Sequence, residues 1–228
     1  MMAAEDEKRL AGEAAVEFVE DGMVVGLGTG STVRYFIERL GAMTAEGLKV
    51  TGVPTSMQTE RLALKAGISL DTLEGHPRLD LAVDGADEVD HELNLIKGMG
   101  GALFREKIVA KAAKRFIVVV DSSKLVSRLG ERTPVPVEVH VFGWKATVGW
   151  LGSLGCTPLL RKSGSAPYIT DNGNFIVDCK FGPISDPPAL EGRINNLPGV
   201  VQNGIFTDMA DIVIVGKGDK VERLTKPK

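Results

Sequence analysis

The 228-residue chain can hold one large or two modest domains, and its 43% hydrophobic content is ordinary for a globular protein. Its formal net charge is −3 with both signs interspersed, so it lacks the basic stripe that neutralises nucleic-acid phosphates. The sequence contains no run of about 18 apolar residues and no apolar signal segment at its start. We therefore expect a cytoplasmic protein with a small-molecule ligand and neither a nucleic-acid nor a membrane partner.

The cysteines and histidines show no metal-binding or disulfide pattern. Cys156 and Cys179 are too few for a disulfide framework and sit beside strand-like sequence, so we expect two buried thiols. The histidines His76, His91 and His140 are scattered, without the spacing of metal ligands or of a nucleophile and its base. We assign none of them a role.

Helical and strand-like patterns alternate along the first part of the chain. This alternation favours a largely parallel α/β sheet. The expected elements are a helix over 6–20, a strand over 23–25, a glycine loop, a helix over 33–40, a strand over 48–53, a helix from Thr55 or Ser56 to Gly67, and strands over 68–73 and 79–83.

A helix over 102–114 and a strand over 116–120 come next. Phe104, Ile108 and Ala112 recur at a spacing of four, and two steps along a helix turn a side chain by about 200°. We therefore expect Glu106 to point away from the apolar face of this helix. The strand over 116–120 is an unbroken apolar run, typical of a strand that is buried on both faces.

The pattern changes after Thr133 and predicts a second domain. Strand-like, helical and hairpin signals follow in the order βαββαβ, the split βαβ arrangement, with a turn at Asp171, Asn172 and Gly173. The strand over 212–215 is apolar enough to return to the first sheet. We therefore predict a Rossmann-like, mostly parallel domain over 1–130 and 207–228, with a smaller inserted α+β domain over 131–206. Within the smaller domain, the elements expected are strands from Thr133, over 157–161, 168–170, 174–179 and 200–206, and helices over 144–154 and 188–196.

A glycine loop, GLGTGST at 26–32, joins a strand to a helix. Glycines let the backbone approach an anion, and the helix offers unpaired N–H groups at its positive end. The loop lacks the third glycine of a dinucleotide fingerprint and the lysine of a Walker A loop. It indicates phosphate binding, with a plain capped turn as the alternative. The expected contacts are Thr29, Gly30, Ser31 and Thr32.

Two aspartates in the sequence DGAD follow the strand over 79–83, at a strand end where open α/β sheets collect ligands. They are surface acids, ligands of a divalent cation, or acceptors for the hydroxyls of an organic ligand. The nearby Lys97 favours a charged polyol over a metal. We expect no metal, and the polyol contacts expected are Asp84, Gly85, Ala86 and Asp87.

Lys97 begins the sequence KGMGG, a cation followed by a turn whose N–H groups can line an oxyanion site. The alternative is a helix-entry loop with a solvated lysine. Glu106, in the next helix, is either a catalytic base or a partner of a neighbouring basic residue. Lys124 is either a phosphate-binding charge or a surface lysine, and Lys8 and Arg9 are equally ambiguous.

The motifs GTGST, DGADE, KGMGGALFREK and VVVDSSK, in this order, resemble ribose-5-phosphate isomerase of the A type. The similarity runs nearly end to end and includes VPVEV from Val135 and TDNGN from Thr170. It implies interconversion of D-ribose 5-phosphate and D-ribulose 5-phosphate through an enediolate, in the non-oxidative pentose phosphate pathway. It also implies a Rossmann-like domain with a smaller α+β domain, no metal or other cofactor, and a homodimer or homotetramer.

The same resemblance implies a role for each motif. Glu106 would move the proton between C1 and C2 of the open-chain sugar. Asp84 would assist ring opening, and Asp87 would hold sugar hydroxyls. Lys97 and the turn amides would stabilise the enediolate oxygen. The turn amides expected in the site are those of Gly98 and Gly100, and the contacts expected around the phosphate and hydroxyls are Thr29, Ser31, Thr32 and Lys124.

Met99 departs from the resemblance, because many members of the family have glycine in this position of the turn. A positive φ would disfavour methionine there. We expect the flanking glycines alone to face the substrate.

Other functions remain open on the residues alone. A sugar-phosphate deaminase, a lactonase or a CoA transferase can use a similar scaffold. A sugar-phosphate sensing domain of a transcription regulator also needs a phosphate loop and hydroxyl-binding acids, but it has no need of Glu106 as a base.

Overall fold

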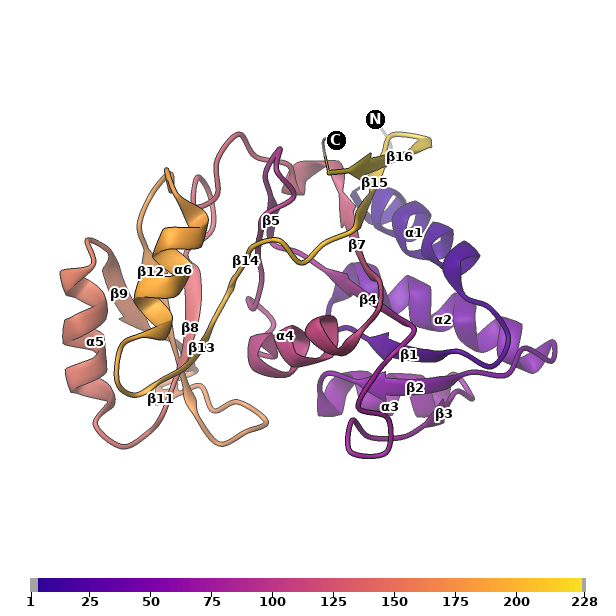
Figure 1. Cartoon of the computed structure of the whole chain (residues 1–228), viewed down its shortest axis with the longest axis horizontal. Coiled ribbons are helices and arrows are strands. Elements are labelled where there is room, and N and C mark those ends of the chain that lie inside the picture. The colour runs from indigo at the N-terminus through magenta and orange to yellow at the C-terminus, as the bar shows by residue number, and fades with distance from the viewer. Residues whose placement is uncertain (1–3, 227–228) are drawn as a thin grey trace. The chain divides into compact units, whose positions relative to one another are not determined.

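The computed structural model describes residues 4–226, and its contacts divide the chain into two compact units (Figure 1). Unit 1 comprises Met1–Ala86, Arg105–Lys124 and Met209–Lys228, and unit 2 comprises Asp87–Phe104 and Leu125–Asp208. The sequence-based boundaries differ mainly by assigning 87–104 to the larger domain. Where the chain divides into folding domains stays a prediction.

A seven-stranded sheet forms the centre of unit 1. Six strands run parallel in the order β3-β2-β1-β4-β7-β15, and β16 pairs antiparallel with β15 at the edge. Numbered along the chain, this is the 3-2-1-4-5-6 order of a Rossmann fold, as predicted. The strands are β1 (Val24–Leu27), β2 (Thr51–Pro54), β3 (Ser69–Leu70), β4 (Leu81–Gly85), β7 (Phe116–Asp121), β15 (Ile212–Lys217) and β16 (Lys220–Thr225).

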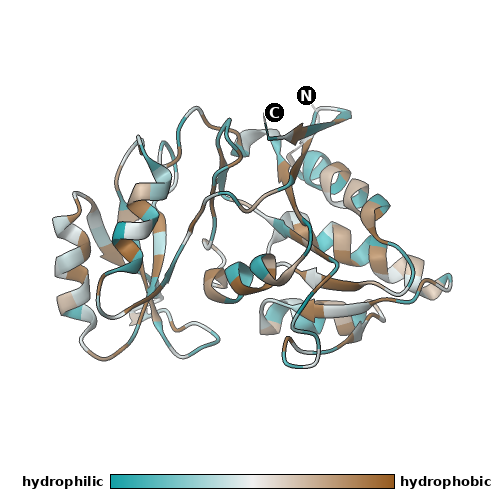
Figure 2. Cartoon of the chain, viewed as in Figure 1, coloured by the Kyte–Doolittle hydropathy of each residue, from teal (hydrophilic) through white to brown (hydrophobic). Residues whose placement is uncertain are grey.

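Helices cover both faces of this sheet, and several of its strands are coloured as hydrophobic in Figure 2. On one face, residues of α1, α2 and α3 share a core with strand residues such as Leu81 and Ile117. Val25 and Leu27 point into that core, so Gly26 between them faces the other side. There α4 packs closely, because a Cβ added at Gly26 would lie 2.4 Å from Val109 Cγ1. The helices are α1 (Ala4–Ala14), α2 (Ser31–Ala45), α3 (Met57–Lys65) and α4 (Leu103–Ala112), with 3₁₀ turns η1 (Ala15–Phe18) and η2 (Ser122–Lys124).

The helix boundaries differ in detail from the sequence-based ones. The helix expected over 6–20 narrows to a 3₁₀ turn at Ala15 and ends at Phe18. By contrast, α2 extends further at both ends than the expected 33–40, because its first turn starts at Ser31 directly after Gly30. Within 4–226, no helix combines the length and the apolar character that crossing a bilayer requires.

Unit 2 contains an antiparallel four-stranded sheet in the order β13-β8-β12-β9. Helices α5 and α6 pack on one face of it, and this βαββαβ arrangement confirms the predicted split βαβ fold. The main elements are β8 (Val135–Val139), α5 (Trp144–Ser153), β9 (Thr157–Leu160), β12 (Phe175–Lys180), α6 (Pro187–Asn195) and β13 (Val200–Asn203). Short strands complete the unit: β5 (Glu88–Val89), β6 (Leu95–Ile96), β10 (Lys162–Ser163), β11 (Ala166–Pro167) and β14 (Ile205–Phe206).

The single strand expected over 200–206 is wrong. The chain changes partner at Gly204, so that β13 pairs with β8 whereas β14 pairs with β6. Close backbone packing explains the break, because a Cβ on Gly204 would lie 2.2 Å from the carbonyl oxygen of Lys97.

Polar side chains in the interior of unit 2 gather around one carboxylate, that of Glu138. The predicted hairpin turn forms around Gly173, with a φ of 79°. Glu138 is fully buried beside it, and Glu138 Oε1 accepts hydrogen bonds from Thr170 Oγ1, Asn172 Nδ2 and Asn174 Nδ2 at 2.9 to 3.1 Å. This one carboxylate therefore organises the whole turn.

Both cysteines are free and buried, which confirms the expectation of buried thiols. The hydrogen bond between the thiols and the burial of Cys179 raise the pKa of Cys179, whereas the same hydrogen bond lowers the pKa of Cys156. Because the thiolate is the reactive form, Cys179 is the less reactive of the two.

Candidate active site

The first group of predicted site residues lies where the strand order of the unit 1 sheet reverses. The reversal falls between β1 and β4, which pair in parallel with Leu27 opposite Val83. Ligands of open α/β sheets bind outside the carboxyl ends of the strands at such a point. The glycine loop follows β1, and Asp84 is the penultimate residue of β4, so the fold places two of the predicted motifs side by side.

Asp84 and the glycine loop are in direct contact. The carboxylate is buried, and Asp84 Oδ1 accepts hydrogen bonds from the amides of Thr29 at 3.1 Å and Gly85 at 2.7 Å. A Cβ on Gly28 would lie 2.2 Å from Oδ1 and 2.6 Å from the Cα of Asp84. Only glycine at position 28 therefore allows this approach.

A cluster of hydroxyls holds the other side of the loop. Thr29 Oγ1 lies 2.8 Å from Thr55 Oγ1, 2.8 Å from Ser56 Oγ and 2.9 Å from Thr59 Oγ1. The amide and the hydroxyl of Thr29 are thus both engaged within the protein. The sequence identified Thr55 and Ser56 only as helix caps, and Ser56 does cap α3 by accepting from the Thr59 amide at 3.1 Å. Their position after β2, the strand beside β1, was the signal for the additional role.

The N-terminus of α2 offers amide donors next to this loop. Gly30 is its N-cap residue, has a φ of 144° and provides no side chain to satisfy the first amides. Within 4–226, the amides of Ser31 and Thr32 make no hydrogen bond. The positive end of a 15-residue helix and two unpaired N–H groups together suit an anion.

Lys124 lies at the same edge of the sheet, in the 3₁₀ turn that follows β7. β7 is the neighbour of β4, and its carboxyl end points the same way because the two strands are parallel. Asp121 accepts from the Ser123 amide at 3.0 Å and orders the turn. Glu7 accepts from Ser122, and the hydrogen bond from the Gly218 amide lowers the pKa of Glu7.

Glu106 is buried in the first turn of α4, with only 3% of its surface exposed. Glu106 does lie on another side of α4 than the series Phe104, Ile108 and Ala112, but that series is not the packed face, so the apolar face was assigned wrongly. The buried face contains Leu103 and Glu106, whereas Ile108 of the apolar series is 42% exposed. A charged residue occupies a buried position, so the spacing of apolar residues alone indicated the wrong face.

The second group of predicted residues belongs to unit 2. Lys97 follows β6 and is almost completely buried, at 2% exposure. Its amide donates to the carbonyl of Gly204 at 2.8 Å, and its Nζ lies 5.4 Å from the ring centroid of Phe206. Backbone pairing and the aromatic face thus hold this ammonium in place.

The glycine turn that follows Lys97 has positive φ at Gly98, 103°, and at Gly101, 83°. Met99 is not among the described non-glycine residues with positive φ, so methionine is compatible with the turn. The Met99 amide donates to Asp87 Oδ2 at 3.0 Å. One carboxylate oxygen of Asp87 therefore holds the turn, and Asp87 Oδ1 makes no hydrogen bond within the described residues.

Two further side chains contact this turn and were missed by the sequence analysis. Arg161 donates to the carbonyls of Gly98 and Met99, and Tyr168 lies against Gly101. They flank the short hairpin of β10 and β11 (the Arg161–Tyr168 hairpin region), 63 residues beyond Gly98 at Arg161, and the sequence of this hairpin carries no ligand-binding motif. Burial, more than the charge of Asp171, raises the pKa of Tyr168, so its hydroxyl stays protonated near neutrality.

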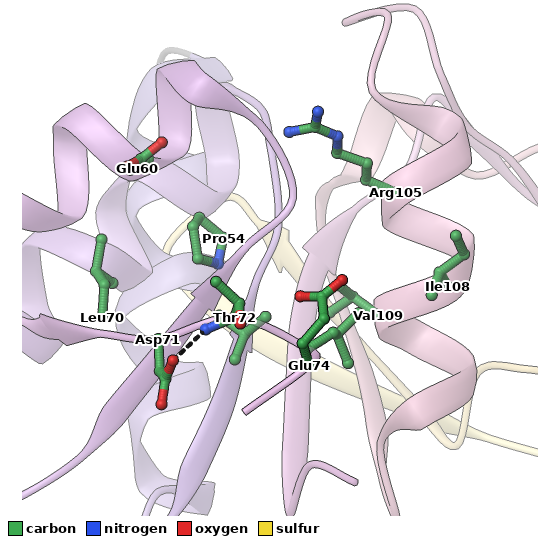
Figure 3. Close-up of a pocket in the computed structure, with 11 residues that line it drawn as sticks. Pro54, Glu60, Leu70, Asp71, Thr72, Glu74, Arg105, Ile108 and Val109 are labelled. Atoms are coloured by element: carbon green, nitrogen blue, oxygen red, sulfur yellow. Dashed lines mark hydrogen bonds between the residues drawn. The ribbon is translucent and has the colours of Figure 1, made fainter. Parts of the chain in front are cut away.

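A cavity of about 620 Å³ in unit 1 is separate from all predicted site residues (Figure 3). Pro54 and Leu70 come from β2 and β3, and Arg105 and Ile108 come from α4. The predicted residues themselves cluster at strand ends and at helix N-termini. Across residues 4–226, no three His, Cys, Asp or Glu side chains group as a metal site requires.

Comparison with known proteins identifies the family. Residues 51–220 match the family model of ribose 5-phosphate isomerase A (phosphoriboisomerase A). The chain is 55% identical over 219 residues to ribose-5-phosphate isomerase A of Gluconobacter oxydans, covering 94% of each chain. It is 50% identical to the Thermococcus kodakarensis enzyme, covering 99% of this chain and 100% of that one.

Solved structures agree with this match. The ribose 5-phosphate isomerase A of Methanocaldococcus jannaschii superposes with a TM-score of 0.94 at 46% identity, covering 98% of this chain and 100% of that one. A D-ribose-5-phosphate isomerase in complex with phospho-erythronic acid reaches a TM-score of 0.96 at 48% identity, covering 99% and 100%. The resemblance seen in the sequence motifs is thereby confirmed, and the chain belongs to the ribose-5-phosphate isomerase A family.

Proposed function

We propose that Glu106 is the base of an isomerase that interconverts ribose 5-phosphate and ribulose 5-phosphate. The family match supports the reaction, and the burial of Glu106 in the first turn of α4 supports its role. In the aldose-to-ketose direction, Glu106 takes the proton from C2 and returns it to C1. The hydroxyl proton on O2 moves to O1 through the enediolate, so that no atom is gained or lost.

Asp84 and Asp87 serve the sugar in this proposal. Asp84 assists opening of the furanose ring, because a buried carboxylate with one oxygen held by two amides keeps a constant orientation. Asp87 accepts hydrogen bonds from sugar hydroxyls through the oxygen that does not hold the Met99 amide. Gly85 and Ala86, between the two acids, contribute backbone contacts to the same substrate.

Lys97 and the amides of Gly98 and Gly100 stabilise the enediolate oxygen. The attraction between an ammonium and an anion is strongest where water is excluded, and the Lys97 ammonium is buried. Its backbone and aromatic contacts keep it in place before negative charge develops on the enediolate oxygen. Preorganised donors of this kind lower the barrier because they need not reorient during the reaction.

The glycine loop and the α2 N-terminus bind the phosphate. The unpaired amides of Ser31 and Thr32 point out of a helix end, and Gly30 leaves the backbone open to an anion. Lys124 adds a point charge from the neighbouring strand end. Thr29 supports the loop through its contacts with Asp84 and the hydroxyl cluster.

Replacing Glu106 with glutamine tests the assignment. The variant keeps the shape of the side chain but cannot take a proton, so we expect kcat to fall about 10³-fold with KM changed less than about threefold. Ribose 5-phosphate turnover, assayed without added metal, measures kcat and KM. Titration with phospho-erythronic acid measures whether the variant still binds a sugar-phosphate analogue. Glu38→Gln, on an exposed position of α2, is the matched control. A fully active Glu106→Gln enzyme would contradict the assignment of Glu106 as the base.

The alternative chemistry of this scaffold is separated by the choice of substrate. A deaminase would consume glucosamine 6-phosphate, whereas the isomerase acts on ribose 5-phosphate alone. A sensing domain would bind ribose 5-phosphate without turnover. The family match favours the isomerase over each of these.

We further propose a cytoplasmic homodimer or homotetramer that uses no metal or other cofactor. The free, buried thiols of Cys156 and Cys179 suit a reducing compartment. Light scattering on the purified chain measures the assembly, and retention of full turnover after dialysis against EDTA tests the absence of a metal requirement.

A further inference from the structure

Arg161 contacts the carbonyl side of the turn after Lys97, where the Gly98 carbonyl also accepts from the Gly101 amide at 3.0 Å. Arg161 Nη1 donates to the carbonyl oxygens of Gly98 and Met99, each at 3.0 Å. Its other nitrogens bind Asp178, with Nε 2.9 Å from Oδ2 and Nη2 2.5 Å from Oδ1. The carboxylate of Asp178 thus fixes one edge of the guanidinium, and Nη1 donates hydrogen bonds to two successive peptide carbonyls.

Tyr168 limits the movement of the same turn. A Cβ on Gly101 would lie 2.2 Å from the Tyr168 hydroxyl oxygen, so the backbone lies directly against the phenol. The hydroxyl is 3.5 Å from the carbonyl of Gly100, and the guanidinium of Arg161 lies 5.9 Å from the ring centroid. The carbonyls of three consecutive residues therefore face side chains of one hairpin region.

Because peptide groups are planar, fixing a carbonyl of the turn also fixes the direction of the amide that follows it. Each carbonyl lies in one plane with the next amide and opposite to it, and the described chain has no cis peptide. Holding the Gly98 carbonyl therefore directs the Met99 amide, which donates to Asp87. Holding the Met99 carbonyl directs the Gly100 amide away from Arg161. Within 4–226, the Gly100 amide makes no hydrogen bond, so it is available to a ligand.

We propose that Arg161, anchored by Asp178, is a positioning residue that orients the turn amides for the enediolate oxygen. This inference rests on the proposed role of the Lys97 turn. Arginine suits the task because its planar fork can bind a carboxylate in two places and still donate to two carbonyls. Lysine at position 161 keeps the charge but cannot span all four acceptors.

Kinetics of Arg161→Gln and Arg161→Lys test the proposal. We expect kcat to fall between about tenfold and 10²-fold, with the KM for ribose 5-phosphate changed less than about threefold, because a loosened oxyanion donor acts mainly in the transition state. The pH profile of kcat keeps its shape, because the base is untouched. Lys162→Gln removes a charge from the next, exposed residue of the same hairpin and should leave kcat within twofold.

A second measurement separates positioning from a merely structural role. Phospho-erythronic acid carries a carboxylate, whose charge mimics that of the enediolate, so its inhibition constant should rise along with the loss in kcat. A loss of folded protein alone would lower the melting temperature and the active fraction, but it would leave that inhibition constant and KM unchanged. An unchanged inhibition constant and KM, together with a lower melting temperature, would overturn the inference.

Asp178→Asn is the milder variant for the case that Arg161→Gln does not fold. It keeps the shape of the anchor and loses its charge, so we expect kcat to fall severalfold. A folded Arg161→Gln, or failing that a folded Asp178→Asn, with kcat within twofold of the parent contradicts the proposal. Glu106→Gln in the same assay separates the role of Arg161 from the catalytic assignment. If Glu106→Gln is inactive and the Arg161 variants are fully active, only the role of Arg161 is rejected. If Glu106→Gln is fully active, the proposed catalytic assignment is rejected.

Discussion

Two glycine-rich segments present amides in this protein, and they are held in different ways. The 28–32 loop of unit 1 joins the end of β1 to the first turn of α2, and its contacts are with Asp84 of the adjacent strand and with hydroxyls that follow β2. The 97–101 turn of unit 2 is held by Asp87 nearby and by Arg161 from a separate hairpin region. The loop therefore depends on the sheet, whereas the turn depends on two side chains and on its own hydrogen bond from the Gly101 amide to the Gly98 carbonyl.

This difference predicts different sensitivities. Three hydroxyls share the contact with Thr29, so the loss of one hydroxyl leaves the strand end and the helix in place. The guanidinium of Arg161 alone spans two carbonyls of the second segment. We therefore expect the loop to lose its geometry when a side chain is added to its backbone, and the turn to lose its geometry when the side chain of Arg161 is removed.

Gly28→Ala should have the largest effect on the loop. The new Cβ would lie 2.6 Å from the Cα of Asp84, which cannot move without displacing β4. We expect kcat/KM to fall more than about 10²-fold, because misplaced catalytic groups lose their alignment. Steady-state kinetics measures this.

Gly22→Ala is the matched control, because Gly22 has a φ of 82° and its added Cβ meets nothing within 4 Å. It should cost about 1 kcal/mol of unfolding free energy and leave turnover intact. Equal kinetic losses in both variants would show that the contact with Asp84 does not set the loop geometry.

Thr29→Val should have an intermediate effect. Valine keeps the volume but leaves buried hydroxyls at Ser56 and Thr59 with one fewer partner, so we expect a loss of about 1 to 2 kcal/mol of unfolding free energy. KM should rise about threefold, and kcat should fall less than in Arg161→Gln. Urea unfolding and kinetics measure the two, with Thr29→Ser as the control that keeps the hydroxyl. A kcat loss larger than that of Arg161→Gln would reverse the comparison of the two segments.

The layout of unit 1 could be read from the sequence because its determinants are local. Alternating helical and strand patterns specify the parallel sheet, and the apolar run of β7 marks a strand that is buried throughout. The glycine loop follows β1 and Asp84 lies at the carboxyl end of β4, so their meeting at one edge follows from the parallel order. The split βαβ unit was predictable for the same reason.

Three features could not be predicted because they depend on packing between distant segments. The buried face of α4 contains Glu106, against the apolar spacing. The strand break at Gly204 arises from contact with the Lys97 backbone. The grip of Arg161 on the turn joins residues 63 apart, and an arginine before a short hairpin looks like any solvated charge.

Met99→Gly should have the smallest effect and sharpens the account of the turn. Methionine is tolerated there without a positive φ, and its side chain is 43% exposed with its sulfur 3.7 Å from Arg161 Nη2. If Arg161 and Asp87 set the backbone, glycine should leave kcat within twofold. It should lower the unfolding free energy by about 0.5 to 1 kcal/mol through the added backbone freedom of the unfolded chain. Met99→Leu, which keeps that restriction, should change neither quantity, so a severalfold change in kcat for glycine alone would mean that the Cβ at position 99, rather than Arg161, restrains the turn.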